Sequence, residues 1–345
     1  MSASDTGVRV RAPAKLILSG EHAVVYGHPA IAMAVNRYTE SHVRFSSPFH
    51  FSFHLLGLDF RQQVTVEALK RLKRQLDKDY HAFHLGQLSI REVLKHPFEL
   101  TLYTAMSVLE RIKHAMPMGL DIVTDSTIPM GCGMGSSAAS VVSLIFALSR
   151  LLDLSLSLDD YLRLGIQSEN LQHGYSSGLD LQIIYQGGCL HYQHGQFSAR
   201  PLPTFPFYLI HTGTPDSPTG ESVLHAKPFF QDPALGEAFE TLTHAWDQTL
   251  PHATLTDVQN LIRDNHQLLI HIGVVPQRVQ TCIQTLEKAG MAAKICGAGS
   301  VRGDAAGVVL VATDEPLEHL QQLVTPFGYD VLSVTGEPYG VQLIQ

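Results

Sequence analysis

Residues 129–140 read PMGCGMGSSAAS, with Gly131, Gly133 and Gly135 at alternate positions and Ser136 and Ser137 directly after them. Glycines in this pattern let successive backbone N–H groups turn toward one anion. The preceding stretch 119–126 is typical of a strand, and the apolar run that follows predicts a helix over about 138–152. Because a helix N-terminus adds partial positive charge, the sequence predicts a phosphate-binding loop here.

Two common phosphate-binding patterns do not fit this stretch. The P-loop requires Lys-Ser/Thr after its glycines, and no lysine follows here. The dinucleotide fingerprint ends in a glycine, and Ser136 stands at that position. One alternative stays open, a flexible glycine turn in which Ser136 or Ser137 caps the helix.

A second group of polar residues lies near the N-terminus. Lys15 follows Ala-Pro-Ala, and Glu21 and His22 come soon after it in SGEHAVVYG. A lysine, an acid and an imidazole in a strand-turn-strand segment could neutralise and orient a polar or negatively charged substrate. The alternative is a surface lysine and an exposed Glu-His turn.

Two carboxylates form the third feature. We expect Glu169 toward the end of a helix over 157–173, whereas Asp180 follows a Ser-Ser-Gly turn. From different elements they could face one site, where one holds a metal and the other takes a proton. Solvated carboxylates are the alternative.

A glycine turn between two apolar strands is the fourth feature. Gly297, Ala298 and Gly299 follow AAKIC, and backbone without side chains permits close approach to phosphates or to a reacting centre. An ordinary hairpin bulge is the alternative.

The 345 residues predict two domains. Prolines 201, 203 and 206 predict a boundary, with domains over 1–200 and 201–345. In the first half we expect helices over 65–81 and 98–116 and an edge strand over 49–58. The second half combines a helical block over about 237–289 with several apolar strands. This pattern predicts an α+β fold, with helices on one face of an antiparallel sheet.

Composition excludes several classes of protein. Lys plus Arg is 24 and Asp plus Glu is 32, a net charge of −8, so we expect no nucleic acid or membrane partner. The most apolar stretch, 138–154, contains Arg150 and Asp153, which argues against a membrane span. The N-terminus lacks an apolar signal segment and the four cysteines lack framework spacing, so we expect a cytoplasmic protein.

The four features occur in the order found in the GHMP kinase superfamily. Residues 12–36 resemble its first motif, and 129–140 resemble its ATP-phosphate motif. Residues 173–180, HGYSSGLD, with GGCLHYQHG at 187–195, resemble the mevalonate kinase segment that carries the catalytic aspartate. The resemblance, which spans about 8–307, implies two domains with the active site in the cleft between them. It also implies ATP-dependent phosphorylation of (R)-mevalonate to 5-phosphomevalonate in isoprenoid biosynthesis, by a homodimer.

Residue roles follow from the same resemblance. Asp180 would be the general base and Lys15 would lie beside it, lowering its pKa and stabilising transition-state charge. Ser137 and Glu169 would coordinate Mg²⁺ on the ATP phosphates. The implied ATP-binding residues are Pro129, Gly131, Gly133, Met134, Gly135, Ser136, Ser137 and Ala138. The implied residues of the acceptor site are Glu21, His22, Thr219, Gly297 and Ala298.

The chain departs from the family pattern at two places. Ser300-Val-Arg302-Gly-Asp304 replaces further glycines of the third motif, and Arg302 is a candidate for contact with phosphate or substrate. Residues 211–221 lack the basic residue usual near this segment, and 46–97 match no motif. Three alternatives therefore stay open: another GHMP kinase, a decarboxylase of the superfamily, or a non-catalytic metabolite sensor. Among the other kinases, phosphomevalonate kinase would be favoured by a second basic cluster.

Overall fold

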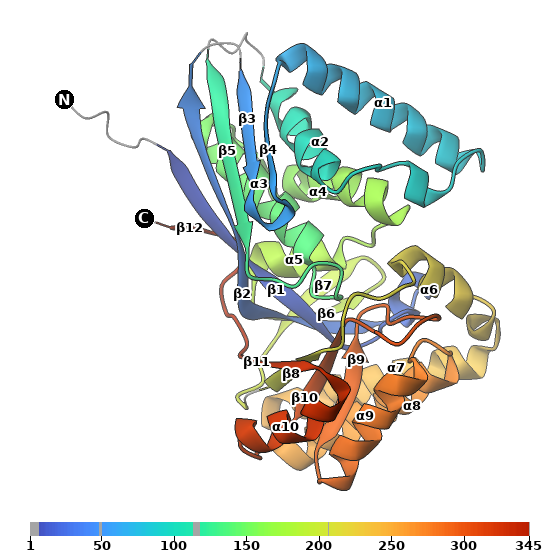
Figure 1. Ribbon diagram of the computed structural model, residues 1–345. Helices are drawn as coiled ribbons and strands as arrows, with labels where there is room; N and C mark the ends of the chain where they lie inside the picture. The colour runs from blue at the N-terminus through green and yellow to red at the C-terminus, as the bar shows by residue number, and fades with distance from the viewer. Residues whose placement is uncertain (1–6, 48–49, 113–117, 206, 345) are drawn as a thin grey trace.

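The structure is a computed structural model that describes residues 7–47, 50–112, 118–205 and 207–344. In these residues the chain forms two sheets, one in the upper and one in the lower part of Figure 1, each with helices packed against it. The fold is α+β, as the sequence predicts.

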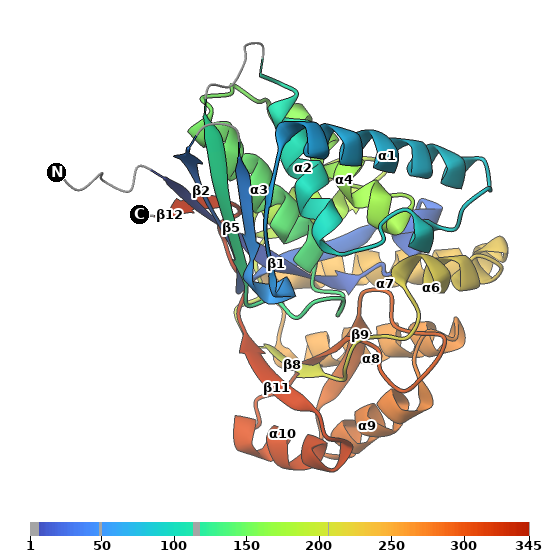
Figure 2. The ribbon, with the colours of Figure 1, turned by 45° about the horizontal axis from the view of Figure 1, so that its top comes forward.

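The upper sheet has eight strands among the described residues, in the main order β12-β1-β2-β5-β3-β4, with the β6–β7 hairpin paired to β2. These strands are β1 Val8–Ser19, β2 Ala30–Ser46, β3 Phe51–Leu55, β4 Phe60–Val64, β5 Gly119–Ser126, β6 Cys189–Gln193, β7 Gln196–Arg200 and β12 Gln342–Ile344. The helices beside them lie on one side of this sheet (Figures 1 and 2) and are α1 Val66–His84, α2 Phe98–Leu109, α3 Ser136–Leu151, α4 Leu158–His173 and α5 Leu179–Gln186.

The lower sheet is antiparallel throughout, in the order β11-β8-β10-β9. Its strands are β8 Phe207–His211, β9 Ala292–Cys296, β10 Val308–Ala312 and β11 Asp330–Val334. The helices of this part are α6 Thr219–Ala226, α7 Pro233–Thr249, α8 Leu255–His271, α9 Gln277–Lys288 and α10 Leu317–Val324. Strand β12 leaves this part and pairs with β1, so the end of the chain joins the upper sheet.

Helix starts follow local capping chemistry. The Thr65 side chain accepts a hydrogen bond from the backbone of Ala68 at the start of α1. Ser157 and Asp160 form a capping box that opens α4, in which each side chain satisfies the other residue's backbone N–H. The helices expected over 65–81 and 157–173 are confirmed. The helical block expected over 237–289 consists of most of α7 and all of α8 and α9.

Two expectations about the first half are wrong in detail. The strand expected at the edge, β3, lies between β5 and β4, because the polar segment 60–64 forms a hairpin with it and becomes the edge instead. Helix α2 ends at Leu109, where the backbone closes into a turn, instead of running to 116. Residues 113–116 of that expectation lie outside the described residues.

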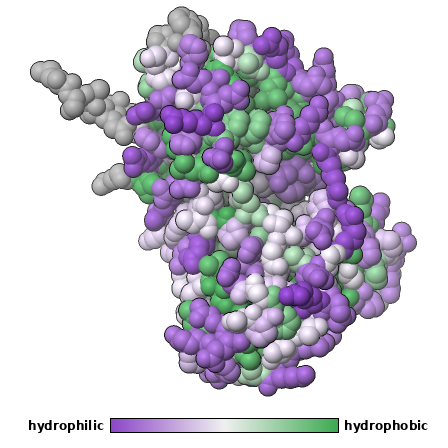
Figure 3. Space-filling view, in the orientation of Figure 1, coloured by the Kyte–Doolittle hydropathy of each residue, from purple (hydrophilic) through white to green (hydrophobic). Residues whose placement is uncertain are grey.

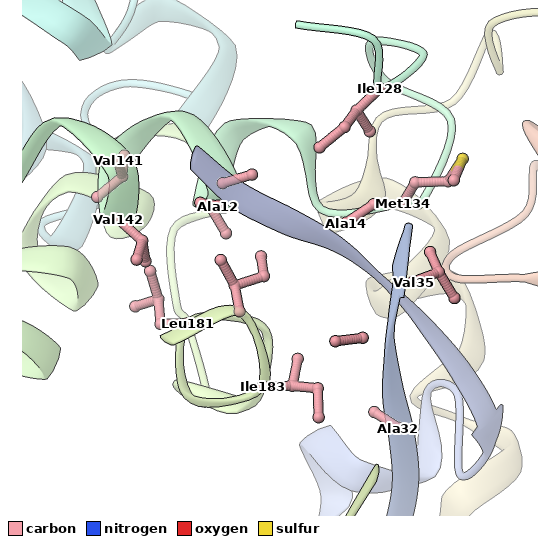
Figure 4. Packing of buried hydrophobic residues seen from close by; sticks show 14 of the residues in the cluster. Ala12, Ala14, Ala32, Val35, Ile128, Met134, Val141, Val142, Leu181 and Ile183 are labelled. Carbon is pink, nitrogen blue, oxygen red and sulfur yellow. The ribbon is translucent and has the colours of Figure 1, made fainter. Parts of the chain in front are cut away.

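Small side chains bring the helices close to the upper sheet. Figure 4 shows Ala12 of β1 near Val142 of α3, with Leu181 of α5 below Val142, and Ala14 farther along β1 near Met134. All of these side chains are buried. Since protein interiors are close-packed, the alanines let α3 and α5 approach β1, and both helices begin near the segments that carry the polar motifs.

Two predictions from the sequence concern a membrane span and the state of the cysteines. Among the described helices, none combines the length and apolar character needed to cross a bilayer. The four cysteines are free and buried. Burial raises the pKa of Cys132, in the glycine loop, to about 11, which keeps this thiol protonated and unreactive.

Candidate active site

The glycine loop lies between β5 and α3 and is held from both parts of the molecule. Lys15 N donates to Met134 O at 3.0 Å, and Val308 N of the lower sheet donates to Cys132 O at 3.1 Å. Gly133 and Gly135 have φ of 85° and 74°, which favours glycine. A Cβ on Gly133 would lie 2.4 Å from Cys296 O, so the close contact between the two parts requires glycine there as well.

The N-terminus of α3 has no side-chain cap, because its N-cap residue is Gly135. This excludes the alternative in which Ser136 or Ser137 caps the helix. The first N–H groups of a helix have no intrahelical partner, and here they open beside a loop of positive-φ glycines. The arrangement has the properties of an anion-binding nest.

Glu169 is buried on α4 and faces the start of α3. Ser137 Oγ donates to Glu169 Oε2 at 3.2 Å, and His173 Nε2 lies 3.5 Å from the same oxygen. Burial alone would lower the pKa of His173, but the hydrogen bond and negative charge of Glu169 outweigh it and the pKa is raised. Glu169 Oε1 is buried without a hydrogen-bond partner within the part of the chain that the structure describes. A buried carboxylate oxygen with no donor is suited to a hard cation.

Lys15 and Asp180 form an ion pair, with Nζ 3.1 Å from Oδ2. Lys15 comes from the middle of β1 and its side chain is 4% exposed, whereas Asp180 lies in the first turn of α5 and is 36% exposed. The lysine is therefore fixed in the interior while the carboxylate remains open to a ligand. The charges of Lys15 and Asp180 both affect the pKa of His173. Because His173 pairs with Glu169, the Lys15–Asp180 pair lies near Glu169 as well.

His22 contacts the third glycine motif. Its Nε2 lies 3.0 Å from the carbonyl oxygen of Ala298, which can only accept, so Nε2 carries the proton. Burial lowers the pKa of His22 to about 4, and the ring is neutral near pH 7. His22 Nδ1 is then a buried acceptor, and no described residue donates to it. His22 also has φ of 61°, a strained backbone of the kind that clusters at functional sites.

The structure also places the remaining predicted residues of the acceptor site. A Cβ on Gly297 would lie 3.0 Å from the Cα of Gly133, so the third motif packs on the glycine loop. Thr219 is exposed at the start of α6. The next residue, Gly220, lies close to α4, because a Cβ added to Gly220 would be 3.7 Å from His173 O. The structure thus brings the four motifs together around one site.

Comparison with known proteins agrees with this arrangement. The family model of the GHMP kinases N-terminal domain matches residues 101–188. Mevalonate kinase of Pyrococcus horikoshii is 32% identical over 305 residues, which cover 85% of this chain and 86% of that protein. The chain belongs to the mevalonate kinase family.

Solved mevalonate kinase structures share the fold. The Methanococcus jannaschii enzyme has a TM-score of 0.80 at 21% identity, covering 97% of this chain and 99% of that one. Mevalonate kinase of L. major in complex with R-mevalonate has a TM-score of 0.70 at 21% identity and covers 96% of each chain. As a member of the family, the chain is an ATP-dependent phosphotransferase with an alcohol group as acceptor.

The sequence analysis did not identify a buried ion pair in this member of the mevalonate kinase family. Lys294 of β9 is fully buried and donates to Glu21, which is also buried, and to Ile17 O at 3.1 Å. Burial raises the pKa of Glu21, although the positive charge of Lys294 opposes the shift. A lysine inside the apolar strand AAKIC was the available signal, because lysine is almost never fully buried unless paired.

A second missed feature is a charged cluster on α6. Glu221 Oε2 accepts from Arg91 Nη2 at 2.7 Å and from Arg302 Nη2 at 2.8 Å. Arg91 comes from the 3₁₀ turn η3 (Ile90–Glu92), in the region that matches no motif. Only the three-dimensional fold brings these side chains together, since 130 residues separate Arg91 from Glu221.

Proposed function

We propose that this chain transfers the γ-phosphoryl group of ATP to the primary hydroxyl of (R)-mevalonate, giving 5-phosphomevalonate. The observation that carries the proposal is the pair of Lys15 and the half-open Asp180 beside the uncapped start of α3. Mevalonate as acceptor is supported by the curated relatives, which are mevalonate kinases, and by the related L. major enzyme in complex with R-mevalonate.

The glycine loop and the start of α3 bind the ATP phosphates in this proposal. Positive-φ glycines and the free N–H groups at the start of α3 offer donors and partial positive charge. Packing against β1 and β9 fixes this donor array before the nucleotide arrives. Phosphoryl transfer depends mainly on such positioning and on neutralising charge.

Mg²⁺ fits the residues at the Ser137–Glu169 contact. The hydroxyl and the buried carboxylate supply hard oxygen ligands, and Glu169 Oε1 has no donor among the described residues. Mg²⁺ usually takes one or two carboxylates together with substrate phosphates. Bound here, it would neutralise charge that develops on the phosphates, and Ser137 and Glu169 would hold it.

Asp180 acts as the general base in this mechanism. Its exposed carboxylate accepts the proton of the acceptor hydroxyl as that oxygen attacks phosphorus. Lys15, held 3.1 Å away, balances the charge of the carboxylate and stabilises negative charge in the transition state. No covalent enzyme intermediate is required.

The acceptor lies in this proposal between His22, Glu21 and the third motif, with Thr219 at the rim. Neutral His22 offers its Nδ1 to a substrate hydroxyl, because its Nε2 proton is engaged by Ala298 O. The Lys294 pair holds Glu21 in the adjacent turn, and Gly297 leaves the backbone accessible.

One observation favours a second candidate, phosphomevalonate kinase. Arg91 and Arg302 form the basic cluster that a substrate phosphate would need. Glu221 shares both arginines, however, so the cluster carries one net positive charge against a phosphate dianion. Together with the curated relatives, this favours mevalonate.

A coupled ADP-release assay with Mg-ATP tests the proposal, using mevalonate, phosphomevalonate and homoserine as acceptors. We expect the wild type to turn over mevalonate and Asp180→Asn to be slower by about three orders of magnitude, because the amide cannot take the proton. Asp153→Asn, at an exposed aspartate just after α3, is the matched control. ATP binding without turnover of any acceptor would support the metabolite sensor instead, and CO₂ release would support a decarboxylase.

A further inference from the structure

We propose that Arg91 and Arg302 bind the carboxylate of the acceptor. The inference rests on the proposed function, because mevalonate carries its carboxylate at the end opposite the reacting hydroxyl. Phosphorylation at one end leaves the carboxylate at the other end free to pair with a cation, and in this proposal the two arginines supply that cation.

The two guanidinium groups converge on one point. Arg91 Nη2 and Arg302 Nη2 lie 2.7 and 2.8 Å from the same oxygen, Glu221 Oε2. The arginine side chains are 54% and 55% exposed and Glu221 is 37% exposed. A carboxylate is therefore already the ligand that this geometry accepts, and a second one can reach the outward N–H groups of either arginine.

Helix α6, which carries Glu221, lies beside two residues of the candidate site. Its Gly220 lies against the carbonyl of His173, the residue that pairs with Glu169. Near the other end of α6, His225 acts electrostatically on His22. The helix therefore runs beside both the metal-binding carboxylate and the acceptor histidine, and Glu221 lies in its first turn.

Arg302 is fixed by the loop that also contacts His22. Ser217 N donates to Ser300 Oγ at 3.2 Å, and Ser300 Oγ donates to Arg302 O at 2.6 Å. Ala298, four residues earlier, accepts from His22. The loop thus connects the acceptor histidine directly to the guanidinium cluster.

The other basic groups near the site are neutral or paired, and His173, whose pKa is raised, pairs with Glu169. Lys15 is neutralised by Asp180, and Lys294 is fully buried against Glu21. His22 is neutral because burial lowers its pKa. In the Arg91–Glu221–Arg302 cluster two positive groups share one negative group, which leaves one net charge to match a single carboxylate. In Figure 3 strongly hydrophilic side chains cross from the upper to the lower part at the right-hand side, beside a hollow in the surface.

The test compares mevalonate with 3-methylpentane-1,3,5-triol, in which a hydroxymethyl group replaces the carboxylate. For Arg302→Gln and Arg91→Gln we expect KM for mevalonate to rise about tenfold or more, with kcat and KM for ATP nearly unchanged. A tenfold rise corresponds to about 1.4 kcal/mol, which the loss of one charge-assisted hydrogen bond accounts for. Arg302→Lys keeps the charge and should recover part of the loss. Arg163→Gln is the control, an arginine of 56% exposure paired with Asp160 on α4.

The triol distinguishes recognition of the carboxylate by the arginines from a purely structural role of the arginines. We expect its KM to be the same in the wild type and in both arginine variants, because it has no carboxylate to lose. An equal rise in KM for the triol, or an unchanged KM for mevalonate, would overturn the carboxylate site while leaving the kinase proposal standing. No turnover of mevalonate by the wild type would overturn both proposals.

Discussion

At the scale of single residues, the site consists of polar groups whose charge is set by their neighbours. Asp180 is open and paired with Lys15, whereas Glu21 and Lys294 are closed off from solvent and paired with each other. Burying a charge costs several kcal/mol unless a partner and hydrogen bonds compensate. The buried pair therefore holds the Glu21–His22 turn in place, at a cost that other contacts in the fold must offset.

The Lys294 pair gives a prediction about stability. Lys294→Met should lower the stability by about 3–5 kcal/mol, because Glu21 loses its partner inside the protein and must bear the cost either of an unpaired buried charge or of taking up a proton. Thermal unfolding followed by circular dichroism would measure the loss. The double variant Lys294→Met/Glu21→Gln removes both charges and should recover a large part of it. A double variant as unstable as the single one would contradict this account.

At the scale of elements, the capped helices and apolar strands could be predicted from local sequence, whereas pairing across the fold could not. The helix predicted over 157–173 formed, and it opens at a capping box of Ser157 and Asp160, which is a local signal. Strand β4 is polar and owes its place to the hairpin with β3. The cluster on α6 joins elements far apart in sequence, so no local pattern could indicate it.

The glycine loop gives a prediction at this scale. Gly133→Ala should raise KM for ATP tenfold or more and lower the melting temperature, because the new Cβ would meet Cys296 O at 2.4 Å where two elements touch. Gly290→Ala is a matched control, since Gly290 has φ of 83° against 85° for Gly133 but has open space around its Cα. Equal effects of the two substitutions would mean that backbone strain alone, and no close contact, requires Gly133.

At the scale of the whole molecule, two sheets meet around the site and contribute to it from both parts. The glycine loop is bonded to β1 above and to β10 below. The chain's end returns as β12 to pair with β1, which ties the upper sheet to the last residues described. The division at 200/201 and a homodimer stay predictions, for limited proteolysis and sedimentation velocity to test.

Buried histidines predict how the stability of the molecule depends on pH. Burial lowers the pKa of His22 and of His266 to about 4, whereas an unfolded histidine titrates near 6.5. Between these values the unfolded chain binds more protons, so stability is lost as pH falls from about 6.5 to 4, by up to about 3 kcal/mol for each histidine. The lowered pKa of His191 adds to this loss of stability, whereas the raised pKa of His173 acts in the opposite direction.

Melting temperatures measured from pH 7.5 to 5 would check this dependence. His266→Gln, away from the phosphate loop on α8, should flatten the decline below pH 6.5 relative to the wild type. His252→Gln, at an exposed histidine, should leave the decline as it is. Parallel curves for the wild type and His266→Gln would show that His266 is not a source of the pH dependence.

The α+β class, the resemblance to the family and the motif residues could be predicted from the sequence, because they depend on periodicity, backbone freedom and local side-chain chemistry. The packed structure was needed to show that Lys294 neutralises Glu21, that Ala298 fixes the proton of His22, and that Glu221 joins Arg91 to Arg302. Burial and electrostatic pairing act through distances in space, and these arise when elements remote in sequence pack together.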